Sequence, residues 1–477
     1  MIVPSFEFLA FATAVALVLG ISAKPLWRRS VLVAANLGFI LTFTHDPLQL
    51  APFAMLLVLG FAGVKLMEAY KRQPAFAVLV VALLSAFCWL KNYSFVPHGL
   101  FLPFAYLTVG MSYVFFRVLH LVIDAYQESL PAPVGVFAYI SYTLNFTSFL
   151  AGPIQFYKDY LRTESQQPAV LDEPSVGRAL ERIIVGFFKV AIVSPLLLLA
   201  HAACVAALST DALFADRVLH AALVLAIFPF YLYANFSGYT DVVIGTARFL
   251  RLELPENFNH PFVSKSFIEL WTRWHITLSL WLRTYVYSPL LLSLMRRFPS
   301  PRVEPWLGVL VYFITFFLIG VWHGQTAMFI ALGLLLGLGV GANKIFQLSM
   351  TKALGRARYR SLCGNPVYSA LSCGLTFAWL GFSLLWFWST PGQLGGFARL
   401  LGPAEIALTF LLVVVLAAIV LTFGEKIRER LRVVAPLDSL RSPPYLRAAW
   451  CTTLAVIIVS VTVVLNAPAP HIVYRAF

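Results

Sequence analysis

Residues 304–343 read EPWLGVLVYFITFFLIGVWHGQTAMFIALGLLLGLGVGAN, two long apolar runs joined by a short segment that carries one histidine. A membrane helix needs about 20 mostly apolar residues, and each run approaches that length. The stretch therefore predicts two membrane helices, with His323 at the point where the first ends and the second begins.

The rest of the chain repeats this pattern of long apolar runs. Hydrophobic residues make up 60% of the 477 residues and charged residues 12%, whereas soluble domains have about 45–50% and about 25%. Further runs lie near 2–21, 31–45, 48–69, 75–95, 101–123, 132–150, 179–209, 215–250, 366–388, 403–423 and 446–466. We therefore predict an all-α polytopic membrane protein with roughly 11 to 13 membrane segments, some of them partial or re-entrant.

The net charge of +14 does not indicate nucleic-acid binding, because the clusters of basic residues lie in short loops between apolar runs. These loops carry Lys24, Arg28, Arg29, Lys71, Arg72, Arg296, Arg297, Arg302 and the basic residues of 344–360 and 426–447. The intervening loops 45–49 and 389–396 carry no lysine or arginine. By the positive-inside rule, the basic loops are cytoplasmic and the N-terminus is outside.

Polar stretches are too short to form a soluble domain, so we expect one membrane domain over 1–477. The first run lacks a basic n-region and carries Glu7, which favours a retained helix over a signal peptide. The five cysteines are scattered and none forms a CxxC pair, so we expect neither a disulfide framework nor a metal site.

One segment, 252–289, is too polar to span a membrane and too apolar to be a simple loop. Pro255 and Pro261 interrupt any helix at its start. From 266 to 288 the pattern becomes amphipathic and rich in tryptophan and arginine. We expect this part not to cross the membrane fully, but to lie along it or dip into it while buried in protein.

Two of the nine histidines lie in distinctive surroundings and are the predicted catalytic residues. His275 follows Trp274 in the amphipathic segment, and His323 follows Trp322 between Gly320 and Gly324. Histidine is the side chain best suited to general-base work near neutral pH. We expect both to border one solvent-accessible cavity near the membrane midplane, with the glycines allowing a ligand to approach His323.

Other polar groups near these histidines are candidates for binding substrate. The tryptophan N–H groups of Trp274 and Trp322 and the guanidinium of Arg273 could stabilise an oxyanion. The remaining candidates are Asn235, Asp241, Glu256 and Asn259, which could orient His275 or Arg273, or only satisfy backbone groups at helix breaks.

Several motifs, in one order, resemble those of bacterial membrane-bound O-acyltransferases, the alginate O-acetyltransferase and teichoic acid D-alanyltransferase branch. The matching segments are Lys91–Tyr93, Ala151–Ile154 with Tyr157, Gly186–Lys189, Asn235–Asp241, Pro255–Asn259, Trp271–Ser279, Trp281–Arg283 and Trp322–Gly324. They define a motif-bearing core over about 91–324. The chain departs from the pattern in three places: Asn235 and Thr284 stand where aspartates are usual, and Leu290–Leu292 stands where Gly-Gly-Asn is frequent.

The resemblance implies helices around a central tunnel and an enzyme of the cytoplasmic membrane. His323 takes the place of the family's invariant histidine, and His275 a position that is often Asn in lipid-modifying members and His in polysaccharide-modifying ones. It implies no bound cofactor, a cytoplasmic acyl thioester such as acetyl-CoA as donor, and O-acylation of an exported polysaccharide. An extracytoplasmic acetyltransferase is the expected partner, besides membrane lipids.

Three alternatives remain open from the sequence. D-alanyl transfer to teichoic acid from a carrier protein is a close variant, which neighbouring genes would distinguish. A transporter or flippase would also use broken helices near the midplane, although the chain shows no inverted repeat and few intramembrane acids. A non-catalytic scaffold of a synthase complex would tolerate loss of His323, whereas an enzyme would not.

Overall fold

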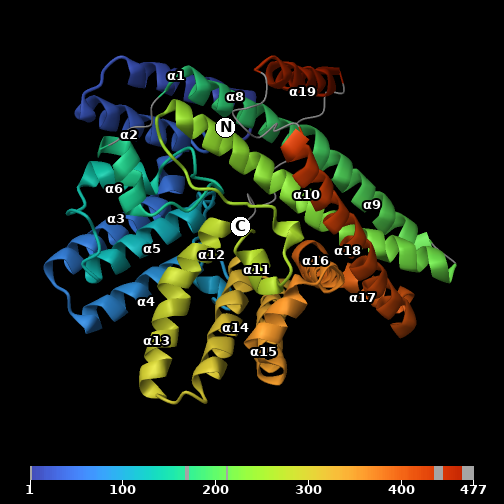
Figure 1. Ribbon diagram of the computed structural model, residues 1–477. Coiled ribbons are helices and arrows are strands. Elements are labelled where there is room, and N and C mark those ends of the chain that lie inside the picture. Colours follow the sequence, from blue (N-terminus) through green and yellow to red (C-terminus); the bar gives the residue numbers. More distant parts are fainter. Residues whose placement is uncertain (1–2, 167–170, 211–212, 435–443, 465–477) are drawn as a thin grey trace. The chain divides into compact units, whose positions relative to one another are not determined.

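The computed structural model describes residues 3–166, 171–210, 213–434 and 444–464, and over these ranges every element is helical (Figure 1). Phe258 and Trp274 form an isolated antiparallel β-bridge. The described residues group into two compact units, one from Met1–Phe188 and Phe236–Glu256, the other from Lys189–Asn235 and Asn257–Asn466. The expectation of one domain over 1–477 stays a prediction.

The first unit is built from the N-terminal helices and the end of α10. Its helices are α1 (Phe6–Gly20), α2 (Pro25–Leu41), α3 (Pro47–Ala69), α4 (Gln73–Leu90), α5 (Met111–Tyr126), α6 (Val136–Thr143), α7 (Tyr157–Leu161) and α8 (Glu173–Phe188), with a 3₁₀ turn at His98–Leu100 and a π-helical turn at Arg162–Gln166. Helix α10 (Phe214–Phe249) begins in the second unit and ends in the first.

The second unit contains the remaining elements. They are α9 (Ser194–Thr210), α11 (Phe267–Trp271), α12 (Ile276–Leu282), α13 (Ser288–Arg297), α14 (Glu304–Trp322), α15 (Ala327–Gly364), α16 (Pro366–Trp388), α17 (Pro391–Leu400), α18 (Pro403–Val434) and α19 (Pro444–Val464), with π-helical turns at Lys189–Val193 and Arg283–Tyr287 and a 3₁₀ turn at Pro261–Val263.

Nine helices in the described ranges are long and apolar enough to cross a membrane, which confirms the predicted all-α polytopic class. They are Pro47–Ala69, Gln73–Leu90, Glu173–Thr210, Phe214–Phe249, Glu304–Trp322, Ala327–Gly364, Pro366–Trp388, Pro403–Arg430 and Tyr445–Thr462. The predicted segments at 2–21, 31–45, 101–123 and 132–150 correspond to α1, α2, α5 and α6. These helices have 15, 17, 16 and 8 residues and are not among the nine.

Local backbone chemistry explains why α5 and α6 are short. Residues 97–104 contain two prolines, and Gly110 adopts φ 76°, so α5 cannot begin before Met111. Helix α6 ends at Thr143, and the chain then runs through 144–156 without a regular helix although almost all of it is buried. Non-helical backbone can be buried in a membrane protein only where its polar groups find partners.

Those partners come from the surrounding helices of the first unit. The Arg117 guanidinium, 1% exposed, donates to the carbonyls of Thr143 at 3.0 Å and Ser148 at 2.7 Å. The Asn36 side chain accepts from the Phe146 N–H, and the Tyr239 hydroxyl accepts from the Ala151 N–H. Ala151–Ile154, one of the motifs that suggested the family, is therefore part of this hydrogen-bonded core.

Helices α14 and α15 pack closely in the second unit (Figure 1). A Cβ atom on Gly320 would overlap the backbone of Gly333, and one on Gly324 would overlap the Phe329 ring. The glycines set how closely α14 approaches the helix that follows it. The expectation that they also let a ligand approach His323 stays a prediction.

The segment 266–288 is not a continuous span, as predicted. Helix α11 is only five residues long and ends at Trp271, and a new helix begins at Ile276 after a break that contains His275. Phe267, Leu270, Trp271, Leu278 and Trp281 are buried, so the apolar face of the segment packs against protein.

Candidate active site

The break before α12 is shaped by pairing between two short stretches of the second unit, 257–259 and 273–277. The Asn259 N–H donates to the Arg273 carbonyl at 2.9 Å, and the Ile276 N–H donates to the Asn257 carbonyl at 3.0 Å. Phe258 and Trp274 form the bridge between these two bonds. The prolines at 255 and 261 keep this first stretch out of a helix, which leaves it extended and able to pair.

Asn257 also binds the start of α12 with its side chain. Its Oδ1 accepts from the Thr277 N–H at 3.2 Å and from the Thr277 hydroxyl at 2.7 Å. Asn257 is fully buried and Thr277 is 3% exposed, so water cannot replace these bonds. Asn257 was not predicted as a site residue, although it lies in the Pro255–Asn259 motif. The sequence signal that could have identified it is an asparagine between two helix-breaking prolines, since asparagine side chains often bind the backbone at the start of a helix.

His275 lies within the paired stretch 273–277 and has a left-handed backbone conformation, with φ 44° and ψ 53°. Histidine is one of the non-glycine residues enriched in that region. The side chain is 1% exposed. Bonds to Asn257 on the C-terminal side and to Asn259 on the N-terminal side thus fix the backbone from which the imidazole projects.

Trp274 and Arg273, next in the chain, have different surroundings. Trp274 is 3% exposed and its ring contacts Phe258, Tyr233 and Phe262, with the Phe258 centroid at 5.3 Å. Arg273 is paired with Glu269 at 2.9 Å and reaches the Asn259 carbonyl at 3.4 Å. The contact uses the Asn259 backbone, and the predicted role of its side chain in orienting His275 or Arg273 stays a prediction.

His323 caps the end of α14. Its N–H donates to the Gly320 carbonyl, and its side chain is 5% exposed. The imidazole lies 4.8 Å from the Trp322 ring and 5.4 Å from Phe387, centroid to centroid. An aromatic enclosure of this kind excludes bulk water and strengthens any polar interaction that the imidazole makes.

His275 and His323 both belong to the second unit, and they lie close enough for a charge on one imidazole to act on the other. The structure thus brings together two residues that are 48 positions apart in sequence. Both side chains are almost completely buried. The cavity and tunnel expected around them stay predictions.

The other two predicted site residues lie on α10. Asn235 is fully buried and its side-chain amide donates to the Ser194 hydroxyl at 3.3 Å in the second unit. Asp241 belongs to the first unit, where it accepts from Arg182 at 3.0 Å, and Glu256 binds the same guanidinium. Asp241 and Glu256 thus share one cation.

Comparison with known proteins fits this geometry. The family model described as MBOAT, membrane-bound O-acyltransferase family, matches residues 125–385, which is more than half of the chain and includes both histidines. The chain belongs to the membrane-bound O-acyltransferase family. The predicted family and enzyme class are therefore confirmed at family level, and the protein is a multi-pass integral membrane protein.

Two groups of relatives in this family resemble the chain. The probable alginate O-acetylase AlgI of Pseudomonas putida strain KT2440 is 31% identical over 227 residues, covering 48% of this chain and 44% of the relative. The teichoic acid D-alanyltransferase of Bacillus subtilis strain 168 is 26% identical over 286 residues, covering 59% of this chain and 69% of the relative. The chain thus spans less than half the length of the Pseudomonas acyltransferase.

Proposed function

We propose that this protein is an O-acyltransferase that moves an acyl group, most simply acetyl, from a cytoplasmic thioester to a hydroxyl of an exported or cell-envelope polysaccharide. The observation that carries the proposal is the pair of buried imidazoles, His275 and His323, brought together in one unit of a family member. The protein would reside in the bacterial cytoplasmic membrane with its N-terminus outside.

In the proposed reaction His323 is the general base. It takes the proton from the acceptor hydroxyl as the oxygen attacks the thioester carbonyl, and the proton then passes to the departing thiolate. The C–S bond breaks, the C–O bond forms, and a free thiol leaves. General-base catalysis of this kind contributes about 10²–10⁴-fold in rate.

His275 and its neighbours would position the donor and stabilise the oxyanion. The hydrogen bonds from Thr277 to the Asn257 side chain support this role, because they fix the backbone next to His275. An oxyanion donor is effective only when it is held in place before the reaction. Trp322 and Trp274 would bound the substrate site, with Arg273, Asn259 and Asn235 around it. Acetyl-CoA would be the donor, and an extracytoplasmic acetyltransferase or the polysaccharide itself would receive the group.

D-alanyl transfer to teichoic acid is the second candidate. Its support is that the Bacillus D-alanyltransferase matches over 69% of its own length, a larger share than the alginate O-acetylase does. The two candidates differ in the group transferred and share the proposed chemistry at His323.

Mass spectrometry of the envelope glycan tests both candidates in one experiment. A strain that expresses His323→Ala is compared with wild type and with His45→Ala, which removes an exposed histidine outside the site. We expect acylation to be lost only in His323→Ala, at equal protein levels in the membrane. The mass of the missing group identifies it as acetyl or alanyl. Wild-type acylation in His323→Ala would refute the proposal and favour a transporter or scaffold.

A further inference from the structure

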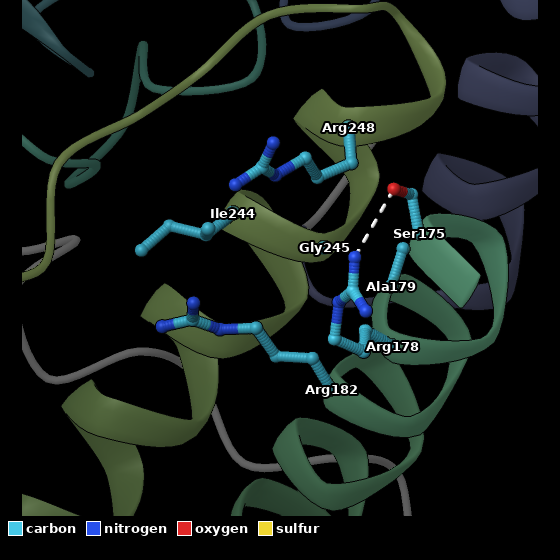
Figure 2. Close-up of a pocket in the computed structure, with 7 residues that line it drawn as sticks. All are labelled: Ser175, Arg178, Ala179, Arg182, Ile244, Gly245 and Arg248. Atoms are coloured by element: carbon cyan, nitrogen blue, oxygen red, sulfur yellow. Dashed lines mark hydrogen bonds between the residues drawn. The ribbon is translucent and has the colours of Figure 1, made fainter. Parts of the chain in front are cut away.

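A separate pocket in the first unit is lined by three arginines and a serine. It has a volume of about 140 Å³ and lies between the first turns of α8 and the end of α10. Its lining residues are Ser175, Arg178, Ala179, Arg182, Ile244, Gly245 and Arg248, with no carboxylate among them (Figure 2).

The close approach of α8 and α10 creates this pocket. A Cβ atom on Gly245 would lie 2.7 Å from Ile183 and 2.9 Å from the Ala179 carbonyl, so only glycine allows the two helices to meet here. Arginines from both helices then lie on the two sides of the contact, as Figure 2 shows for Arg182 and Arg248. The site is therefore a built part of the helix packing.

The three guanidinium groups differ in how far they are already neutralised. Arg182 is held by Asp241 and Glu256, and Arg248 is paired with Glu253 at 3.1 Å. Arg178 is exposed, donates to the Ser175 hydroxyl at 3.2 Å, and lies close enough to the Asp172 carboxylate for their charges to interact. A guanidinium has five N–H donors. Arg178 keeps four for a ligand, and three of the five on Arg182 are already used.

Further arginines of the first unit lie near the end of α10. Arg28 donates to the carbonyls of Leu250 and Arg251, and Arg162 and Arg248 share Glu253. The segments that carry these arginines therefore meet at the end of α10. Because lysine and arginine accumulate on the cytoplasmic side of membrane proteins, this end would face the cytoplasm at the level of the lipid headgroups.

Size and charge together limit the ligand. Pockets for whole drug-sized molecules are about 300–1,000 Å³, so 140 Å³ holds one chemical group of a larger molecule. Arginine forks match the oxygens of phosphate, which accepts several N–H bonds at once.

We propose that this pocket binds a phosphate group at the cytoplasmic boundary of the membrane, with Arg178 as its main ligand. The phosphate belongs to a phospholipid headgroup or to a phosphorylated thioester donor such as a coenzyme A ester. The lipid source is independent of the proposed acyl transfer, and the donor source rests on it.

Binding to the purified full-length protein in detergent tests this proposal. The probes are phosphatidylglycerol in mixed micelles, coenzyme A, and inorganic phosphate, each at matched ionic strength because exposed charges are screened by salt. The variant is Arg178→Gln, and its matched control is Arg358→Gln, which removes an exposed arginine from α15. Thermal melting in each preparation shows that all three proteins are folded.

A charge-assisted hydrogen bond is worth about 1.5–3 kcal/mol, so Arg178→Gln should weaken binding by at least about tenfold, and Arg358→Gln should not. A loss confined to phosphatidylglycerol identifies a lipid site, and a loss confined to coenzyme A identifies a donor site. If all probes bind wild type and Arg178→Gln equally, or none binds wild type, the proposal is wrong. Since acyl transfer is not measured, that failure leaves the proposed function standing.

Discussion

Replacing Asn257 by alanine removes the acceptor that holds the start of α12. Two bonds are lost, from the Thr277 N–H at 3.2 Å and from its hydroxyl at 2.7 Å. Both donors are buried, and a buried donor left without a partner costs about 1–3 kcal/mol. The Asn257 carbonyl still accepts from Ile276, so we expect a net loss of about 2–3 kcal/mol in the free energy that holds His275 in its left-handed conformation.

If catalysis needs that conformation, the loss appears in the rate. Each 1.4 kcal/mol corresponds to a factor of ten, so Asn257→Ala should lower kcat by about ten- to a hundredfold, with a smaller change in KM for the donor. The matched variant is Thr277→Val, which loses only the hydroxyl bond. About 1 kcal/mol, or roughly fivefold in kcat, is expected for it.

The double variant separates this explanation from general destabilisation. If Asn257 acts through Thr277, the two changes share one interaction and the double variant is no slower than Asn257→Ala. Acyl transfer by purified protein in liposomes gives kcat and KM, and thermal melting reports the fold. Additive effects on kcat, or wild-type kcat in Asn257→Ala, would refute the positioning role.

Three further predictions follow from the fold. Gly320→Ala should lower thermal stability by about 1–3 kcal/mol through overpacking against Gly333, and a melting temperature equal to that of wild type would show that α14 and α15 are less tightly packed. Arg117→Met should prevent accumulation in the membrane, because it leaves the buried carbonyls of Thr143 and Ser148 without their donor; normal levels on a membrane immunoblot would contradict this. Reporter fusions at residues 355 and 395 should lie in opposite compartments, 355 in the cytoplasm, since α16 separates them, and the same compartment for both would overturn the predicted topology.

The helical class and the break before α12 could be predicted because they depend on composition and local pattern. Apolar runs require lipid or protein around them, and tryptophan and arginine at helical spacing do not suit a lipid-facing span. The prediction was less accurate for 101–123 and 132–150, where hydropathy alone suggested full spans. Residues 110–122 and 141–150 are buried in protein, and hydropathy does not distinguish this environment from lipid.

The site was predicted in part for a similar reason. His275 and His323 stand out because a histidine near apolar segments is costly unless it has a function. The close packing at Gly320 and Gly324 was not predicted, because a glycine that lets a ligand approach and a glycine that lets a helix approach have the same local sequence. Asn257 was missed because its partner, Thr277, is 20 residues away and only the folded chain brings them together.

The left-handed backbone at His275 limits which side chains can evolve there. At φ 44° a β-branched or bulky residue is strained, whereas asparagine, aspartate and histidine are the side chains most often found in this conformation. These three side chains offer different chemistry: an amide, a carboxylate and an imidazole. The exchange of histidine and asparagine that the family resemblance implies for this position is then what the backbone permits. The backbone would therefore accept His275→Asn without rebuilding the loop.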